Sequence, residues 1–241
     1  MSRRIGRRDF LKQSALAGAA LSIPSIFIHP RFAHAVVDPA ATKKFGSSLK
    51  GRLILPGDSE YESARKIWNA KYDKHPAMIA RCAATDDVVR AVEFARQNEL
   101  PVSIRSGGHD QAGYSTNDGG MVIELAGLKR INIDRTRKTV ACGGGVLVGE
   151  LYAAVAPTGM GVVSGGCPTV GIGGFTLGGG ESAVSSKYGL ACANVTALEV
   201  VTADGHTLSA RPDENPDLFW ALRGGSGNFG VVTKFEYRLV P

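Results

Sequence analysis

The alternation of apolar and polar residues predicts a strand–helix–strand unit in the first part of the chain. Residues 78–82 are mostly apolar and form the first expected strand. Thr85 is expected to cap the helix that follows, with two acidic residues at its positive end, and apolar residues recur at helical spacing from Val88 onwards. Beyond Pro101, apolar and polar residues alternate over 102–105, as in a second strand.

The rest of the chain is rich in short strand patterns, and together with the first unit this predicts an α+β fold. Asp204-Gly205 is a strong turn pair and is expected to close a hairpin. We expect a flexible lead-in over residues 36–50, because this stretch is polar, and folded structure beyond it. The further expected elements are strands over 121–124, 131–134, 139–142, 195–202, 206–210 and 231–239, and helices over 148–155 and 217–222.

Residues 1–35 have the parts of an export signal. Two adjacent arginines precede Phe10, residues 14–28 are mostly apolar, and an Ala-x-Ala sequence ends at Ala35. This order predicts a twin-arginine signal peptide, cleaved after Ala35, and a periplasmic or secreted mature protein with no membrane partner. The alternative is a basic amphipathic helix or a membrane anchor, but Pro24 interrupts an apolar stretch that is already short for a bilayer span.

The positive charge of the chain is concentrated in the same segment. Residues 1–35 carry six basic residues and one acidic residue, which leaves +1 of the chain's net +6 for everything that follows. A nucleic-acid-binding domain needs a basic patch in its folded part, so no nucleic-acid partner is expected.

The four cysteines do not form a metal-binding motif. Their spacing matches no zinc pattern, and no metal site is expected. After export they would meet an oxidising compartment. If a cofactor uses Cys167, at most one disulfide can form among Cys82, Cys142 and Cys192, and the sequence leaves the pairing open.

Two common nucleotide-binding motifs are excluded. Residues 225–230 match G-x-G-x-x-G, but a helix is expected before them and a strand after them, the reverse of a dinucleotide-binding fingerprint. The sequence contains no G-x-x-x-x-G-K-[ST] phosphate loop and no G-x-S-x-G nucleophile elbow.

The first glycine-rich motif runs from Arg105 to Ser115, directly after an expected strand. Backbone N–H groups of such a loop can point at phosphate oxygens, and the side chains of Arg105 and Ser106 can add a charge and a hydroxyl donor. His109 in this loop is a poor candidate for a packed core histidine. The alternative is a loop whose glycines only allow the chain to turn.

The second glycine-rich motif covers residues 164–180 and contains Cys167. A segment with so few side chains cannot pack through them, so we expect a flat or phosphorylated group to lie against its backbone. A cysteine in such a segment is accessible, unlike the usual buried cysteine. A purely structural glycine turn is the alternative.

Taken together, the two motifs resemble those of the FAD-linked oxidases of the berberine-bridge-enzyme-like group, within the vanillyl-alcohol-oxidase (PCMH-type) flavoprotein superfamily. The resemblance covers about residues 50–241 and implies a PCMH-type FAD-binding domain over 51–241, built of two α+β subdomains at about 51–125 and 126–241. The other segments that carry it are Lys187 to Leu190, Leu198 to Gly205, Asp217 to Arg223 and Gly224 to Thr233.

The resemblance implies FAD held by two covalent bonds, from His109 to the flavin 8α-methyl carbon and from Cys167 to flavin C6. It also implies a cradle for the pyrophosphate in the first motif and close approach of the second motif to the flavin. The implied cofactor-binding residues are Arg105, Ser106, Gly107, Gly108, His109, Asp110, Ser115, Cys167, Gly171, Gly173, Gly174, Asn194, Val195 and Val232.

Three positions depart from the usual family pattern. Glu181 stands where an aromatic residue is common, Ser186 where an arginine is usual, and Ala193 where an aspartate often occurs. None of these departures affects the two implied attachment residues, His109 and Cys167.

The implied activity is oxidation of an alcohol or carbohydrate-like small molecule by hydride transfer to the flavin. The resemblance implies that acid/base residues come from a substrate-binding domain after the last strand, and we expect that domain to be absent from residues 1–241. No catalytic base can therefore be assigned; Tyr114, Tyr188 and Glu181 are merely near the motifs. One possibility is an active oxidoreductase whose C-terminal half is missing here, either because the sequence is a fragment or because a neighbouring chain supplies that half. The other is a flavin-binding module without turnover on its own. A glycine-rich structural protein without a cofactor is a third reading.

Overall fold

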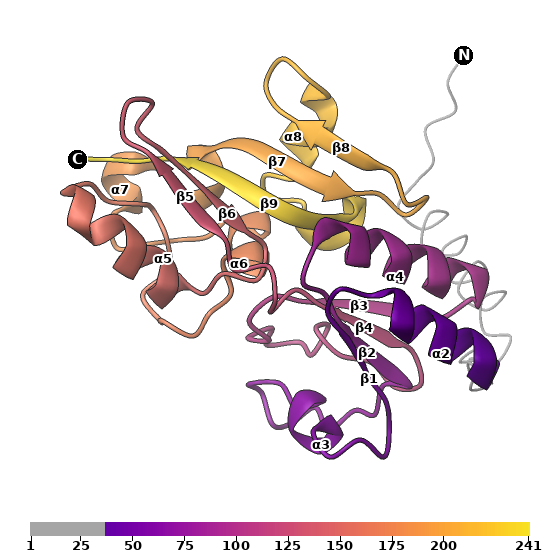
Figure 1. The fold of residues 1–241 in the computed structure, drawn as a ribbon. Helices are drawn as coiled ribbons and strands as arrows, with labels where there is room; N and C mark the ends of the chain where they lie inside the picture. Colours follow the sequence, from indigo (N-terminus) through magenta and orange to yellow (C-terminus); the bar gives the residue numbers. More distant parts are fainter. Residues whose placement is uncertain (1–36) are drawn as a thin grey trace, which may run out of the picture. The chain divides into compact units, whose positions relative to one another are not determined.

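The computed structural model describes residues 37–241 (Figure 1). The expected signal peptide lies outside these described residues. Among the described residues, no helix is both long and apolar enough to cross a bilayer.

The first sheet has four strands in the order β1-β2-β4-β3, in which β2, β4 and β3 run parallel and β1 is antiparallel to β2. All four residues of β4 are buried, as expected of a parallel strand with both faces covered. The strands are β1 (Arg52–Ile54), β2 (Met78–Arg81), β3 (Val102–Arg105) and β4 (Met121–Glu124).

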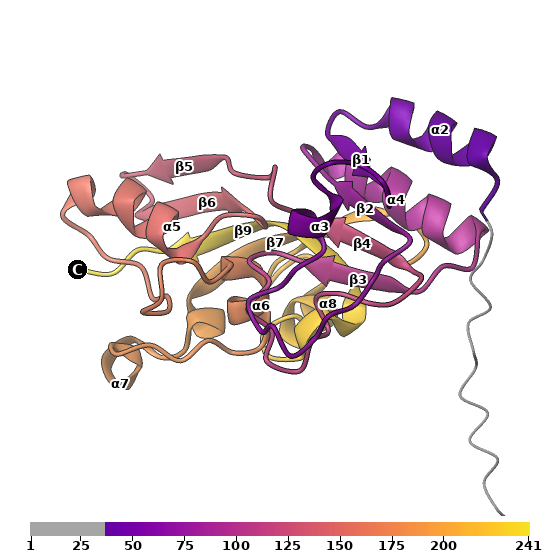
Figure 2. The ribbon, with the colours of Figure 1, turned by 90° about the horizontal axis from the view of Figure 1, so that it is seen from below.

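Two helices pack together beside this sheet, α2 (Pro39–Ser48) and α4 (Thr85–Gln97) (Figure 2). Phe45 of α2 stacks on Phe94 of α4 with ring centroids 4.3 Å apart, and both side chains belong to the core of the first sheet. The expectation of a flexible lead-in over residues 36–50 is therefore wrong for α2, because one buried aromatic contact anchors an otherwise polar segment.

The buried carboxylate of Asp87 holds the start of α4 against the chain that follows α2. It accepts hydrogen bonds from the backbone N–H groups of Lys50, Gly51 and Ala83 at 2.8–2.9 Å. The expected capping role of Thr85 is wrong: Ala84 occupies the N-cap position and makes no side-chain cap bond.

The second sheet has five antiparallel strands in the order β5-β6-β9-β7-β8. The hairpin of β7 and β8 confirms the expected turn, where Gly205 has φ +88°, a left-handed value that glycine accepts without strain. The strands are β5 (Ile131–Asp134), β6 (Thr139–Gly143), β7 (Val195–Val201), β8 (Thr207–Ala210) and β9 (Val231–Arg238).

Short helices connect these strands, and α5 and α8 confirm the two helices expected from the sequence. The remaining α-helices are α3 (Tyr61–Ala64), α5 (Val148–Val155), α6 (Ile172–Leu177), α7 (Ser185–Tyr188) and α8 (Pro216–Ala221), and the 3-10 helices are η1 (Ala156–Thr158), η2 (Ala191–Asn194) and η3 (Ser226–Phe229).

Contacts join the two sheets directly. Val201 and Val231 of the second sheet are buried in the hydrophobic core of the first. The Thr85 hydroxyl donates to the Glu199 carboxylate at 2.8 Å. The Thr85 side chain is thus used between α4 and β7, not at the helix end.

Candidate functional site

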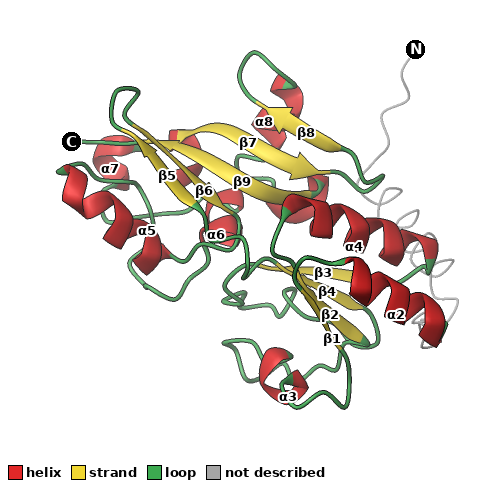
Figure 3. Ribbon diagram, viewed as in Figure 1, coloured by secondary structure: helices red, strands yellow, loops and turns green. Residues whose placement is uncertain are grey.

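The two glycine-rich motifs meet backbone to backbone. A Cβ atom added to Gly171 would lie 2.2 Å from the Gly107 nitrogen and 2.2 Å from the Ser106 hydroxyl, and one added to Gly107 would lie 2.2 Å from the Gly171 nitrogen. Real Cβ atoms essentially never come so close, so glycine is required at both positions. Both motifs are drawn mostly as loop in Figure 3.

This junction brings His109 and Cys167 to the same hydroxyl group. The Thr169 Oγ1 atom lies 3.0 Å from His109 Nε2 and 3.4 Å from Cys167 Sγ. Two residues that the sequence placed in separate motifs are therefore connected through one side chain.

Trp68 contacts the ring of His109. Its ring stacks on the His109 imidazole with centroids 5.2 Å apart and an interplanar angle of 20°, although 65% of Trp68 is exposed. Sequence reasoning missed Trp68 because nothing in its neighbourhood links it to the motifs. It also missed Thr169, for which the position two residues after Cys167 was an available signal.

Of the four cysteines, which are all free, only Cys167 is exposed, as the second motif predicted. The Thr169 hydroxyl, followed by backbone N–H groups, lowers the pKa of the Cys167 thiol. Burial raises the pKa of Cys142 to about 12 and raises the pKa of Cys82. Cys167 is thus the reactive thiol of the described chain, and the disulfide left open by the sequence is not present.

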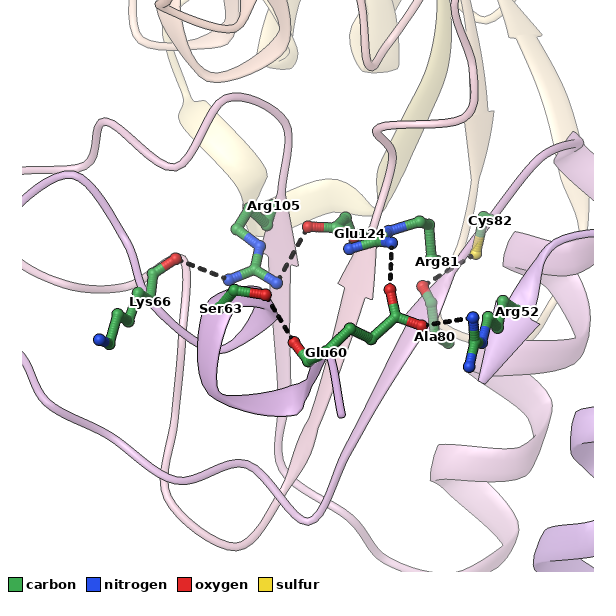
Figure 4. A network of polar contacts seen from close by, with 9 residues as sticks. All are labelled: Arg52, Glu60, Ser63, Lys66, Ala80, Arg81, Cys82, Arg105 and Glu124. Atoms are coloured by element: carbon green, nitrogen blue, oxygen red, sulfur yellow. Dashed lines mark hydrogen bonds and ion pairs between the residues drawn. The ribbon is translucent and has the colours of Figure 1, made fainter. Parts of the chain in front are cut away.

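The Arg105 side chain is directed into the first sheet. Its guanidinium lies 3.0 Å from the Glu124 carboxylate, and the ion pair is almost completely buried. Arg81 also pairs with Glu124 and reaches Glu60 at 3.0 Å (Figure 4). Burial lowers the pKa of Arg105, with the opposing charge of Glu124 acting against it. In this structure Arg105 therefore supports the strand before the first motif, and its contact with a cofactor stays a prediction.

The polar residues of the first motif also have partners within the chain. Ser106 Oγ donates to the Gly144 carbonyl at 2.6 Å, and Asp110 accepts from the Tyr114 N–H at 2.8 Å. Gly108 has φ +70°. The Ser115 hydroxyl is buried and has no hydrogen-bond partner among the described residues. Its hydrogen-bonding capacity is therefore unused within the described chain.

The three implied positions at the second sheet, Asn194 at the end of η2, Val195 in β7 and Val232 in β9, are buried. Asn194 donates to the carbonyls of Tyr188 and Leu190 and accepts from Arg238, each at 2.9 Å. Val195 and Val232 belong to the hydrophobic core of this sheet. Side chains at these positions serve the fold, so any cofactor contact there would come from the backbone.

Three other glycines of the second motif differ in how closely they are packed. Gly173 packs closely, since an added Cβ would lie 3.1 Å from the Gly144 carbonyl. An added Cβ at Gly166 or Gly174 would meet nothing within 4 Å, and both residues are exposed. The motif thus presents bare backbone beside Cys167, a surface that a flat ring can approach closely.

A separate cleft of about 310 Å³ lies between the loop before α4 and strands β6, β7 and β9. Its polar groups are largely satisfied by one another: Glu199 accepts from Thr85 and from Thr233, at 2.8 and 2.7 Å. None of its lining residues belongs to the two glycine-rich motifs. We place the candidate site at the motif junction, where the reactive side chains are.

The fold and this junction define the class of protein: a PCMH-type FAD-binding fold of mixed α+β content in two sheets. Residues 76–211 match the family described as the FAD binding domain, and the chain belongs to that family.

Among its relatives, the chain is 42% identical over 192 residues to (R)-6-hydroxynicotine oxidase of Paenarthrobacter nicotinovorans, which covers 80% of this chain and 42% of the relative. The solved structure of Physcomitrella patens BBE-like 1 is similar with a TM-score of 0.79 and 34% identity, covering 82% of this chain and 44% of that one. The solved structure of Acremonium strictum glucooligosaccharide oxidase is similar with a TM-score of 0.78 and 28% identity, and the match covers 83% of this chain and 42% of that one. That oxidase is described as holding 6-S-cysteinyl, 8α-N1-histidyl FAD. The chain therefore spans less than half the length of these relatives.

The residues at the junction fit FAD. Exposed backbone at Gly166 and Gly174 suits a planar ring, and the two nucleophilic side chains converge on Thr169. The first motif also holds the unpaired, buried Ser115 hydroxyl, which suits a polar group.

Proposed function

We propose that this protein is an FAD-dependent oxidoreductase that oxidises an alcohol or carbohydrate-like substrate, with its flavin held covalently through His109 and Cys167. The observation that carries the proposal is the convergence of these two side chains on Thr169, beside bare glycine backbone. It is supported by the solved relative described as holding cysteinyl and histidyl FAD.

The roles of the chain's own residues follow from the junction. His109 and Cys167 hold the cofactor, Trp68 fixes the plane of the imidazole, and Gly166 and Gly174 leave the backbone free of side chains. When bound, FAD supplies the two-electron acceptor: it takes the hydride of the substrate C–H bond while the hydroxyl proton leaves to a base, and an external oxidant such as dioxygen then removes the two electrons.

Atoms and electrons balance in the same way for the attachment through His109 and for the attachment through Cys167. The nitrogen of His109 or the sulfur of Cys167 takes the place of one carbon-bound hydrogen. His109 or Cys167 would lose its proton, and the two electrons released would require an external oxidant such as dioxygen, reduced to hydrogen peroxide.

Acid precipitation tests the attachment. We expect flavin absorbance to stay in the pellet for the wild type and for His109→Ala and Cys167→Ala singly, since one bond remains in each. The double variant is expected to release its flavin. His206→Ala, an exposed histidine in the hairpin turn, and Cys192→Ala, a buried thiol, are matched controls that should keep both bonds. Flavin in the wild-type supernatant would contradict the covalent proposal.

Anaerobic bleaching tests the activity. A panel of alcohols, sugars and 6-hydroxynicotine is added to the flavin-loaded protein, and loss of the oxidised flavin spectrum reports hydride transfer. No bleaching with a full panel would favour a flavin-binding module without turnover. Restoration of bleaching by a second chain would identify a partner that supplies the substrate domain.

We also propose export by the twin-arginine route, on the strength of the arginine pair, the apolar stretch and the Ala-x-Ala sequence in residues 1–35. N-terminal sequencing of the protein from the periplasm or medium is expected to start at Val36. A sequence that retains the arginine pair would refute it.

A further inference from the structure

The Thr169 hydroxyl has an unusual position, because both of its neighbours are nucleophiles. It lies 3.0 Å from His109 Nε2 and 3.4 Å from Cys167 Sγ. A hydroxyl has one proton to donate and lone pairs to accept. It can therefore serve both neighbours only if it donates to one and accepts from the other.

Two arrangements of protons satisfy this rule. With a neutral thiol, the sulfur donates to Oγ1 and Oγ1 donates to Nε2, so that the imidazole proton sits on Nδ1. With a thiolate, Oγ1 donates to the sulfur and accepts from Nε2–H, so that the lone pair lies on Nδ1. Where the thiol is the donor, loss of its proton therefore reverses the direction of both hydrogen bonds and changes the tautomer of His109.

We propose that Thr169 is a positioning residue that couples the ionisation of Cys167 to the tautomer of His109, so that the thiolate and the Nδ1 lone pair become available together. This inference rests on the proposed attachment of flavin to both side chains. It goes beyond that attachment because it names the residue that prepares both nucleophiles.

The surroundings of the three residues support the coupling. Trp68 stacks on the imidazole and limits its rotation, which keeps Nε2 directed at Thr169. The pKa of the Cys167 thiol is lowered first by the Thr169 hydroxyl and then by the backbone N–H groups of Thr169 and Val170, with burial opposing and without a contribution from a charged side chain. Thr169 thus contacts both the Cys167 sulfur and the His109 ring.

Two substitutions separate the hydroxyl from the shape of the side chain. Thr169→Val removes the hydroxyl and keeps the volume, and Thr169→Ser keeps the hydroxyl. Thr169 is exposed, so neither change should disturb the fold. Retained folding is checked by circular dichroism.

The first readout is the pH dependence of iodoacetamide alkylation, measured on the full chain purified before flavin is added. Cys167 is the exposed thiol and the other three cysteines are buried, so the native rate reports Cys167, and Cys167→Ala gives the background. We expect the Thr169→Val profile to move to higher pH and its rate near neutral pH to fall about threefold, because only the thiolate reacts. Thr169→Ser should follow the wild type.

The second readout is the tautomer of His109 in long-range ¹H–¹⁵N spectra, assigned with His109→Ala. In the wild type, the tautomer should change over the same pH interval in which Cys167 ionises. In Thr169→Val and in Cys167→Ala, that change should disappear. A merely structural threonine would not produce this pattern.

The proposal is overturned if Thr169→Val keeps the wild-type alkylation profile or if its His109 tautomer still follows Cys167. Covalent flavin content after addition of FAD distinguishes the two proposals. Wild-type protein that binds no covalent flavin, with the coupling intact, would sink the attachment and leave the coupling. Covalent flavin in the wild type, together with a His109 tautomer that does not follow Cys167, would support the attachment and overturn the coupling.

Discussion

The contact between Gly107 and Gly171 allows the fold and the cofactor surface to be tested separately with two substitutions in one helix. Gly171→Ala places a Cβ 2.2 Å from a backbone nitrogen, whereas Gly174→Ala places one where nothing lies within 4 Å. Gly171 is the N-cap of α6 and Gly174 lies inside it. The two changes are chemically identical and three residues apart.

Their expected effects on stability have opposite signs. The Gly171 neighbours are backbone atoms and the Ser106 hydroxyl, which cannot swing away as a long side chain can, so we expect a loss near the upper end of the range for overpacking, about 3 kcal/mol. Gly174→Ala should instead stabilise the flavin-free protein by about 0.5–1 kcal/mol, because alanine is the better residue within a helix. For a domain of this size these values correspond to a Tm lower by about 6–12 °C and higher by about 1–4 °C.

Thermal unfolding followed by circular dichroism measures both shifts in flavin-free protein. The same two proteins are then incubated with FAD, and bound flavin is measured after gel filtration. Gly174→Ala is expected to fold well and bind less flavin, since its methyl group occupies the bare surface. A Gly171→Ala protein as stable as the wild type would refute the close approach of the two motifs. Unchanged flavin binding by Gly174→Ala would refute the placement of the cofactor over α6.

Three further changes test other parts of the structure. Asp87→Ala should cost up to about 3 kcal/mol in urea denaturation, because it leaves three backbone N–H groups without their buried acceptor. A loss below about 1 kcal/mol would contradict the role of this carboxylate in holding the start of α4. Arg105→Met should cost about 3 kcal/mol or less, because the buried Glu124 carboxylate loses one of its two arginine partners and keeps only Arg81. Glu124→Gln in the same protein should recover part of the loss, and equal losses with and without this second change would refute the ion pair. Burial acts to raise the pKa of Glu199, but hydrogen bonds from two threonine hydroxyls and a nearby lysine outweigh it and hold the pKa below its ordinary value of 4.5. A carboxyl whose pKa is lowered on folding adds stability above pH 4.5, and this stability is lost as the pH falls through the folded pKa. Glu199→Gln should therefore destabilise the protein by about 1 kcal/mol or less at neutral pH and not at all in strong acid. A loss of stability that persists in strong acid would contradict this.

Local sequence patterns predicted most of the strands and helices correctly. Short alternating segments became strands, and the Asp204-Gly205 pair became the turn of the β7–β8 hairpin, because these choices depend on neighbouring residues alone. The expectation of a flexible lead-in over residues 36–50 was wrong because the helix there depends on a contact between distant residues. Helix α2 is held by Phe45 against Phe94, a contact between residues far apart in the chain that periodicity does not reveal.

The same division applies to the candidate site. The sequence by itself determined the two glycine-rich motifs, the reactive types of His109 and Cys167, and the family to which they point. Only the tertiary structure decided that Gly107 and Gly171 pack together, that Thr169 joins the two nucleophiles and that Trp68 covers the imidazole. The physical reason is that a residue's type and its immediate neighbours are written in the local sequence, whereas hydrogen bonds and close packing between distant segments depend on the path that the whole chain takes through space.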